Sequence, residues 1–201
     1  ENVAWKVAIP GQGWSQPVVV GGTVYLTTAV GEGLQAPLGF ASGMAHASSS
    51  AGPGKAPDVT IEWRVLALEL ASGKELWSAS VGRAMPKFPQ HPSNTWATET
   101  PVADASGVVA FIGPTGTLAA FDTTGKARWK VELGVHAMHE GYGTGSSPAI
   151  LEGKVFVQSF SAEQGWLACF DARNGKELWR ITHEASTSWS SPLVWRNRMR
   201  T

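Results

Sequence analysis

The stretch "LALELASGKELW" at residues 66–77 decides the fold, because it recurs twice further along the chain. "LAAFDTTGKARW" occupies residues 118–129 and "LACFDARNGKELW" occupies residues 167–179. Each copy contains an apolar run, a polar turn ending in Gly-Lys, and a closing tryptophan. The closing tryptophans lie 52 and 50 residues apart. A repeat of this length indicates an architecture in which supersecondary units stack on one another.

The composition describes a neutral globular protein with a sizeable core. The 201 residues are 43% hydrophobic and 16% charged, and 16 basic residues balance 16 acidic ones. This zero net charge argues against a nucleic-acid partner, which would need a basic surface. One cysteine, Cys169, excludes an intramolecular disulfide and a multi-cysteine metal site. No apolar run reaches the roughly twenty residues that span a bilayer, so we expect no direct membrane insertion of this segment.

Two further phrases accompany the repeated stretch. The first contains a proline and reads "WSQPVVV", "TETPVAD", "GSSPAIL" and "WSSPLVW" in successive units. The second follows a glycine and reads "GGTVYLT", "SGVVAFI" and "GKVFVQS". β-Branched and aromatic residues fill these runs, and Gly, Asn, Asp and Ser occupy the joints, as in strands connected by hairpin turns. Each unit therefore predicts four short antiparallel strands, which is typical of a β-propeller blade.

The phrases divide the chain into three full blades and two partial ones. We predict an all-β fold, a partial propeller of four-stranded antiparallel blades over residues 1–201. The predicted parts are an outer-strand remnant at 3–9, a blade at 14–82 with an insertion at 31–60, blades at 97–134 and 144–182, and an incomplete blade at 189–201.

The repeated tryptophans are expected to pack between neighbouring blades, because a large flat ring suits that space. "VAWKVAIP" at 3–10 resembles "ARWKVELG" at 127–134, so a further tryptophan closes an earlier copy near the start of the chain. The expected structural residues of the repeat are Trp5, Trp77, Trp129, Trp179, Gly73, Gly125, Gly175, Asp122 and Asp171.

The copies resemble the A-x-D-x-x-T-G-K-x-x-W repeat of the PQQ-like quinoprotein propeller superfamily. The aspartate is kept as Asp122 and Asp171 and becomes Glu69 in the first copy. In character the chain is most similar to non-catalytic members such as the propeller lipoprotein of the outer-membrane β-barrel assembly machinery. The resemblance implies a ring of seven or eight blades in the periplasm or another extracytoplasmic compartment. We therefore expect this chain to be a fragment, completed by the remaining blades or by a second copy in a homodimer.

Candidate binding residues lie in three long connections, at 31–60, 83–97 and 135–146. These connections are expected to emerge on one face of the propeller, and loops on a rigid scaffold commonly carry binding sites. The first is rich in Gly, Ala, Ser and Pro, which predicts a flexible loop. The candidate binding-face residues are Asn94, Trp96, His136, His139, Glu140 and Tyr142.

Three histidines occupy similar positions in successive units. His91, His139 and His183 precede the next proline phrase by nine or ten residues, so their loops could present them around one axis. Imidazole binds metals and anions, which makes these residues candidates for a metal site. The alternative is an inherited repeat pattern with no ligand. We favour the second interpretation and expect no metal.

The residues favour binding over catalysis. Quinoprotein dehydrogenases carry a disulfide between adjacent cysteines beside a Ca²⁺ held by Glu, Asn and Asp, and Cys169 alone cannot form that ring. No Ser-His-Asp order, phosphate loop or zinc signature is present. We therefore expect a scaffold that uses its loop face to bind a protein partner or ligand, without a cofactor. Two alternatives stay open: a fragment of a dehydrogenase that uses PQQ and Ca²⁺, and the sensor domain of a membrane-anchored regulator.

Overall fold

The computed structural model describes residues 2–37 and 56–196, and the strands of this part form three four-stranded antiparallel sheets. The strands of the first sheet are β1 (Val18–Val20), β2 (Thr23–Val30), β3 (Ile61–Glu69) and β4 (Glu75–Ala84). Those of the second are β5 (Val102–Asp104), β6 (Gly107–Ile112), β7 (Thr117–Phe121) and β8 (Ala127–Glu132). Those of the third are β9 (Ala149–Leu151), β10 (Lys154–Phe160), β11 (Gly165–Asp171) and β12 (Glu177–His183).

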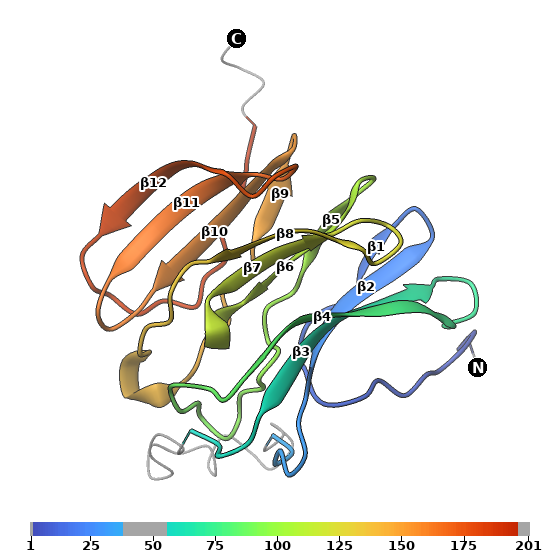
Figure 1. Cartoon of the computed structure of the whole chain (residues 1–201), viewed down its shortest axis with the longest axis horizontal. Coiled ribbons are helices and arrows are strands. Elements are labelled where there is room, and N and C mark those ends of the chain that lie inside the picture. Colours follow the sequence, from blue (N-terminus) through green and yellow to red (C-terminus); the bar gives the residue numbers. More distant parts are fainter. Residues whose placement is uncertain (1, 38–55, 197–201) are drawn as a thin grey trace.

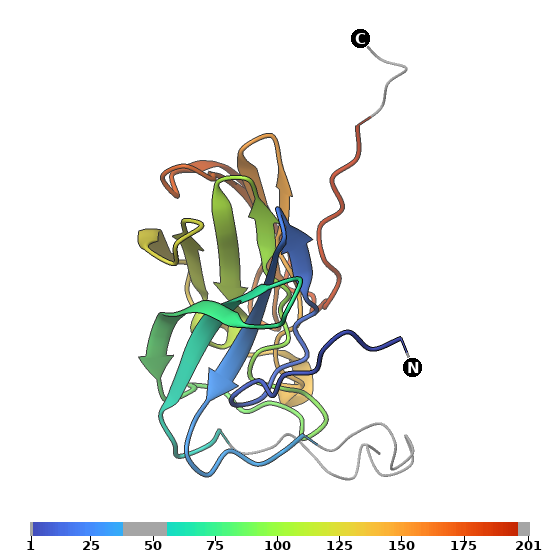
Figure 2. The ribbon, with the colours of Figure 1, turned by 90° about the vertical axis from the view of Figure 1, so that its right-hand side faces the viewer.

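The three sheets stand side by side like the sectors of a fan (Figure 1). Within each sheet the strands follow the order of the chain, and every neighbouring pair is antiparallel. The first strands of the sheets lie innermost, where β5 contacts both β1 and β9. Viewed from the side, the segment that leads into β1 and the segment after β12 run along this same inner edge (Figure 2). This arrangement confirms the predicted partial β-propeller.

The middle blade is buried on both faces, which explains its continuously apolar strands. On one face Val108, Ala110 and Ile112 of β6 join a cluster with the first blade that includes Trp63 and Val65. On the other face of β6, Val109 and Phe111 join the third blade in a second cluster. Successive side chains of a strand point to opposite sides, so one strand supplies both interfaces. The core therefore lies between blades, not within a single sheet.

The turn between the third and fourth strands is held by its own polar residues. In the second blade, the Asp122 carboxylate accepts hydrogen bonds from the Thr124 hydroxyl and from the backbone amides of Thr124 and Lys126. These bonds lower the pKa of Asp122. Gly125 closes the turn with φ +84°, a conformation that favours glycine. In the first blade Glu69 replaces the aspartate and hydrogen-bonds the Ser72 hydroxyl instead.

Each repeated tryptophan that has a following blade lies against the turn glycine of that blade. A methyl group added to any of these glycines would collide with the ring. It would lie 2.4 Å from Trp5 at Gly73, 2.7 Å from Trp77 at Gly125 and 2.6 Å from Trp129 at Gly175. The indole N–H groups donate to carbonyls of the same turns: Trp5 to Leu70 at 2.8 Å, Trp77 to Thr123 at 2.9 Å and Trp129 to Ala172 at 2.9 Å. The contact thus joins each blade to the next through stacking and a hydrogen bond.

The last repeated tryptophan, Trp179, has no following blade in the described part of the chain and remains 41% exposed. It contacts Phe156 of its own blade, with ring centroids 6.1 Å apart. Ile181, two residues further along β12, is also about half exposed. The cysteine of this blade, Cys169, is fully buried, and burial raises the pKa of its thiol. The outer strand of the third blade therefore presents an uncovered apolar surface.

Three predicted segments differ from or extend beyond the described structure. Residues 3–9 are not a strand, although Trp5 occupies its expected place, because no strand lies beside this segment to share backbone hydrogen bonds. In the predicted incomplete blade at 189–201, residues 189–196 contain no strand for the same reason, and 197–201 lie outside the described residues. Most of the insertion at 31–60, residues 38–55, also lies outside them.

The tight contact between Gly125 and Trp77 makes a direct prediction. Gly125→Ala should lower the free energy of unfolding by about 3 kcal/mol, because the methyl group adds a steric clash to the cost of a positive φ. The measurement is chemical denaturation followed by circular dichroism.

Gly153→Ala is the matched control. Gly153 also has a positive φ, of +69°, but a methyl group there would meet nothing within 4 Å. This change should therefore cost only about 1 kcal/mol. Equal costs for the two substitutions would show that the turn glycine is not limited by the tryptophan.

Candidate functional site

The inner ends of the blades are linked by hydrogen bonds between the proline phrases. The residue directly before each of the first three prolines donates its backbone N–H to the side chain of the equivalent residue in the next unit. The three bonds run from Gln16 to Thr100 Oγ1 at 3.0 Å, from Thr100 to Ser147 Oγ at 3.0 Å and from Ser147 to Ser191 Oγ at 2.9 Å. Equivalent residues of successive blades are thereby held in a regular series around the inner edge.

The residues three positions before each proline line one large pocket, which we call the axial pocket. Its volume is about 530 Å³, and it opens at the inner edge of the blades. The four equivalent residues are Trp14, Thr98, Gly145 and Trp189. The loops preceding the proline phrases supply the rest of the lining: His91, Ser93, Asn94, Tyr142 and Thr144. The repeat thus brings residues from four units of the sequence into a single site.

The aromatic residues of the axial pocket contact one another. Tyr142 stacks on His91 with ring centroids 5.2 Å apart, and it meets Trp189 edge-on at 5.9 Å. The Trp189 indole N–H donates to the carbonyl of Gly143 at 2.7 Å, which attaches the segment after β12 to the loop between β8 and β9. His91 is only 6% exposed, and its Nδ1 lies 2.6 Å from the Ser93 hydroxyl. The aromatic wall is therefore fixed by neighbours on several sides.

Asn94 joins the two loops that form the rim of the pocket. Its side-chain amide donates to the carbonyls of Tyr142 and Thr144, at 2.9 and 3.1 Å. Its oxygen accepts from the Thr95 backbone amide and the Thr98 hydroxyl, at 2.7 and 2.6 Å. All the ordinary hydrogen-bonding positions of this amide are thus used within the protein. Asn94 positions the loops around the pocket.

A buried carboxylic acid lies behind the wall of the axial pocket. Glu99 is 1% exposed, and neither carboxyl oxygen makes a regular hydrogen bond within the described structure. A methyl group on Gly113 would lie 2.3 Å from both Glu99 Oε1 and Thr144 Oγ1, so these two oxygens meet over this glycine. Burial raises the pKa of Glu99 to about 7, although the nearby Thr144 hydroxyl and backbone amides partly offset this effect. An unpaired buried acid is costly, which makes it a candidate functional group.

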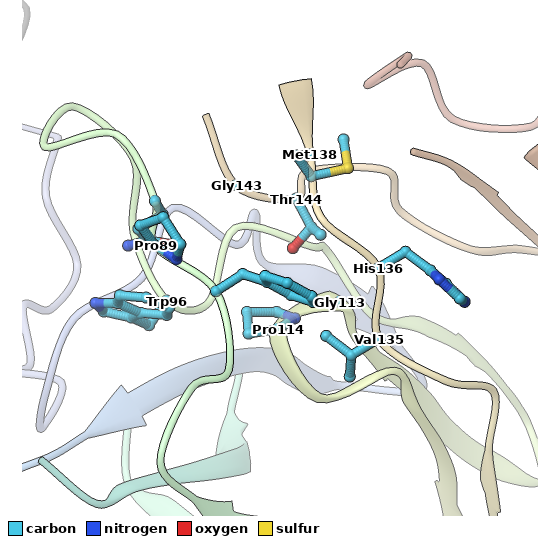
Figure 3. Close-up of a pocket in the computed structure, with 11 residues that line it drawn as sticks. Pro89, Trp96, Gly113, Pro114, Val135, His136, Met138, Gly143 and Thr144 are labelled. Carbon is cyan, nitrogen blue, oxygen red and sulfur yellow. The ribbon is translucent and has the colours of Figure 1, made fainter. Parts of the chain in front are cut away.

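A small cavity of about 20 Å³ lies on the other side of Thr144 and Gly113. Thr144 directs its hydroxyl into this space between Trp96 and Pro114, whereas His136 extends away from it (Figure 3). His136 instead contacts Glu163, at 3.0 Å, and Gln164, at 2.8 Å. The cavity has room for about one water molecule.

The structure separates the predicted binding-face residues into different roles. Asn94 and Tyr142 line the axial pocket. Trp96 is 7% exposed and belongs to the core between the first two blades, so it is not a surface residue. His139 and Glu140 lie on the exposed loop surface and contact each other at 3.8 Å.

The three histidines proposed as metal ligands are not brought together. His91 is buried against Tyr142, His139 is on the loop surface, and His183 packs on Phe160 with ring centroids 5.4 Å apart. Residues 2–37 and 56–196 contain no group of three or more His, Cys, Asp or Glu that could hold a metal ion. Similar spacing from the next proline does not bring these histidines together, because loops of similar length fold differently before each proline.

Sequence reasoning missed Glu99 and two tryptophans of the pocket lining, Trp14 and Trp189. A signal for Glu99 was present, because the residue two positions before the proline is serine in the other three units: Ser15, Ser146 and Ser190. One charged residue in an otherwise small and neutral position marks the place where one blade differs from the repeat.

These features define a β-propeller whose blades are joined by tryptophans and glycine turns. A family profile described as outer membrane protein assembly factor BamB matches residues 62–197, which is more than half of the chain. The chain belongs to this family of PQQ-like propellers. No helix in the described part of the chain is long and apolar enough to cross a membrane.

Individual relatives include quinone-dependent dehydrogenases. Quinohemoprotein alcohol dehydrogenase ADH IIB of Pseudomonas putida is 28% identical over 160 residues, which cover 68% of this chain and 22% of that protein. The dehydrogenase subunit of alcohol dehydrogenase (quinone) from Gluconobacter oxydans (strain 621H) is 33% identical over 137 residues, covering 61% of this chain and 17% of the relative. The chain thus spans about a fifth of the length of these two relatives.

Solved structures share the fold at lower identity. Quinohemoprotein alcohol dehydrogenase ADHIIG from Pseudomonas putida HK5 has a TM-score of 0.51 at 21% identity, over 89% of this chain and 22% of its own. A europium-containing methanol dehydrogenase also has a TM-score of 0.51, at 17% identity, over 90% of this chain and 26% of its own. These matches show the propeller fold alone.

The buried Glu99 predicts that stability depends on pH. Its pKa is about 7 in the folded protein against an ordinary value of 4.5, so the folded state holds the proton more tightly than the unfolded state. This contribution is complete below pH 4.5 and is lost as pH rises towards 7. The free energy of unfolding should therefore fall by about 3 kcal/mol over this range.

Denaturation of the protein and its Glu99→Gln variant at several pH values measures this effect. The variant cannot ionise at residue 99, so its stability should lack this decline. A decline of equal size in both proteins would show that other groups cause it.

Proposed function

We propose that this chain is part of a non-catalytic propeller scaffold that binds a protein or ligand in the axial pocket of its loop face. The axial pocket carries the proposal, since equivalent positions of four repeat units build it and aromatic side chains form much of its wall. A pocket with a mostly apolar lining and a few fixed polar groups is the usual form of a binding site.

The polar groups of the site favour binding over chemistry. Asn94 uses its amide to hold the two loops together, and the His91 ring is stacked on Tyr142 beside Ser93. The Ser93 hydroxyl is within hydrogen-bond distance of His91 Nδ1, but that nitrogen also accepts the Ser93 backbone N–H at 3.1 Å, and no aspartate or glutamate in the described lining orients the ring. These residues fix the shape of the pocket, which is what a rigid recognition surface requires.

The uncovered face of the third blade supports a larger assembly. Trp179 and Ile181 expose an apolar surface on β12, and the earlier repeated tryptophans all lie against a following blade. We propose that a further blade covers this face, either from the remainder of a longer protein or from a second copy. We also propose an extracytoplasmic, periplasmic location, since the family description names outer membrane protein assembly.

A part of a quinone-dependent alcohol dehydrogenase is the second candidate function, and the two curated relatives favour it. The described residues do not fit the quinone, because PQQ carries three carboxylates and the axial pocket has no lysine or arginine in its described lining. The unpaired Glu99 behind the wall would oppose an anion as well. Dye reduction by this chain that requires both added PQQ and Ca²⁺ would favour the dehydrogenase over the scaffold.

The binding proposal is tested with a small neutral probe, 3,3-dimethylbutan-1-ol, in a nuclear magnetic resonance titration. The probe should shift the signals of the Trp189 indole and the Asn94 side-chain amide in a saturable manner. Trp195, whose side chain is 75% exposed and does not line the pocket, is the internal control and should not respond. Equal shifts at Trp195, or none at Trp189, would contradict a binding role for the axial pocket.

A further inference from the structure

We infer that the axial pocket recognises an organic cation of the quaternary ammonium class, with the aromatic wall around the cation and the Glu99 carboxylate as its buried counter-charge. This inference rests on the proposed binding function and adds the class of ligand. Two independent features of the site lead to it.

The first feature is the aromatic lining. Trp14, Tyr142 and Trp189 line the pocket from three different parts of the chain. Aromatic faces attract cations through their quadrupole, and quaternary ammonium groups suit such sites because they are bulky, weakly hydrated and without hydrogen-bond donors. The described lining offers no aspartate or glutamate at its surface, so a strongly hydrated ion such as Ca²⁺ would find no direct carboxylate ligand there.

The second feature is the position of Glu99. Thr98 and Thr144 both line the pocket. Glu99 directly follows Thr98 in the chain, and its Oε1 lies over Gly113 together with Thr144 Oγ1. Neither of its oxygens has a regular hydrogen-bond partner in the described structure. A positive charge in the pocket would stabilise the ionised acid through the low-dielectric wall, without direct contact. The cost of burying this acid is thereby offset when the pocket holds a cation.

The described groups that act on the Glu99 carboxyl include no cation. Its oxygens lie among the Thr144 hydroxyl and the backbone amides of Gly113 and Thr98, all of which are uncharged. The titratable residues in the described pocket lining are His91, whose Nδ1 faces Ser93, and Tyr142, which stacks on His91. The Glu99 carboxylate is therefore free to balance the positive charge of a ligand, and the aromatic-lined pocket is large enough to hold that ligand.

Choline and 3,3-dimethylbutan-1-ol form a matched pair of probes, because they have the same shape and differ only in charge. Titration calorimetry or the same nuclear magnetic resonance signals give both affinities at pH 8, where Glu99 is ionised. We expect choline to bind at least tenfold more tightly than the neutral alcohol. Equal affinities would overturn the cation assignment while leaving the proposed binding pocket intact, whereas no binding of either probe would overturn both.

Variants separate the two features. Glu99→Gln should weaken choline binding about tenfold and leave binding of the neutral alcohol unchanged. Glu140→Gln removes an equally negative but exposed carboxylate from the same face and should change choline affinity less than twofold.

Trp189→Leu keeps an apolar side chain but removes the ring, and should weaken choline binding more than alcohol binding. A Glu99→Gln protein that binds choline as well as the parent would contradict the inference.

A third probe distinguishes the source of the cation. A short peptide with one trimethyllysine carries the same ammonium group on a polypeptide. Binding of this peptide at least tenfold more tightly than choline would assign the cation to a protein partner. Weaker binding than choline would assign it to a free solute.

Discussion

The contact between a tryptophan of one blade and the glycine turn of the next is the interaction on which this structure depends. A four-stranded sheet exposes two faces and cannot bury both alone. The tryptophan fills the outer part of the gap between sheets, and the glycine permits the ring to approach the backbone closely. The indole hydrogen bond fixes the relative position of the blades as well as their separation.

This spacing of the blades determines the inner edge, where the candidate site forms. Because the same contact recurs between successive sheets, equivalent residues before each proline fall into a regular series, linked by bonds such as that from Thr100 to Ser147. The repeated positions form the pocket, but the residues that differ between units determine what the pocket can bind. Trp14 and Trp189 replace the smaller Thr98 and Gly145 at equivalent positions, and Glu99 replaces a serine. The functional proposals rest on these departures.

The sequence predicted the blades well because their signals are local. Turn residues such as Gly125 and the continuously apolar runs of β6 and β7 indicate conformations that depend mainly on nearby residues. Contacts that depend on loop paths were not predictable. Trp96 was expected on the surface and lies in the core. The histidines lie apart because the two loops follow different paths: Glu140 has a φ of +47° in one, and His91 stacks against Tyr142 in the other. Residues 3–9 failed as a strand because a strand also requires a neighbour, which local sequence cannot reveal.

Hydrogen exchange of the tryptophan indole N–H groups tests the central claim most directly. If the tryptophans are docked on the following turns, the indoles of Trp5, Trp77 and Trp129 should exchange slowly, because each donates to a carbonyl. Trp179, with no following blade in the described structure, should exchange rapidly in the monomer. Exchange at Trp77 and Trp129 as fast as at Trp179 would contradict the account, since the blades would then not be joined by this contact.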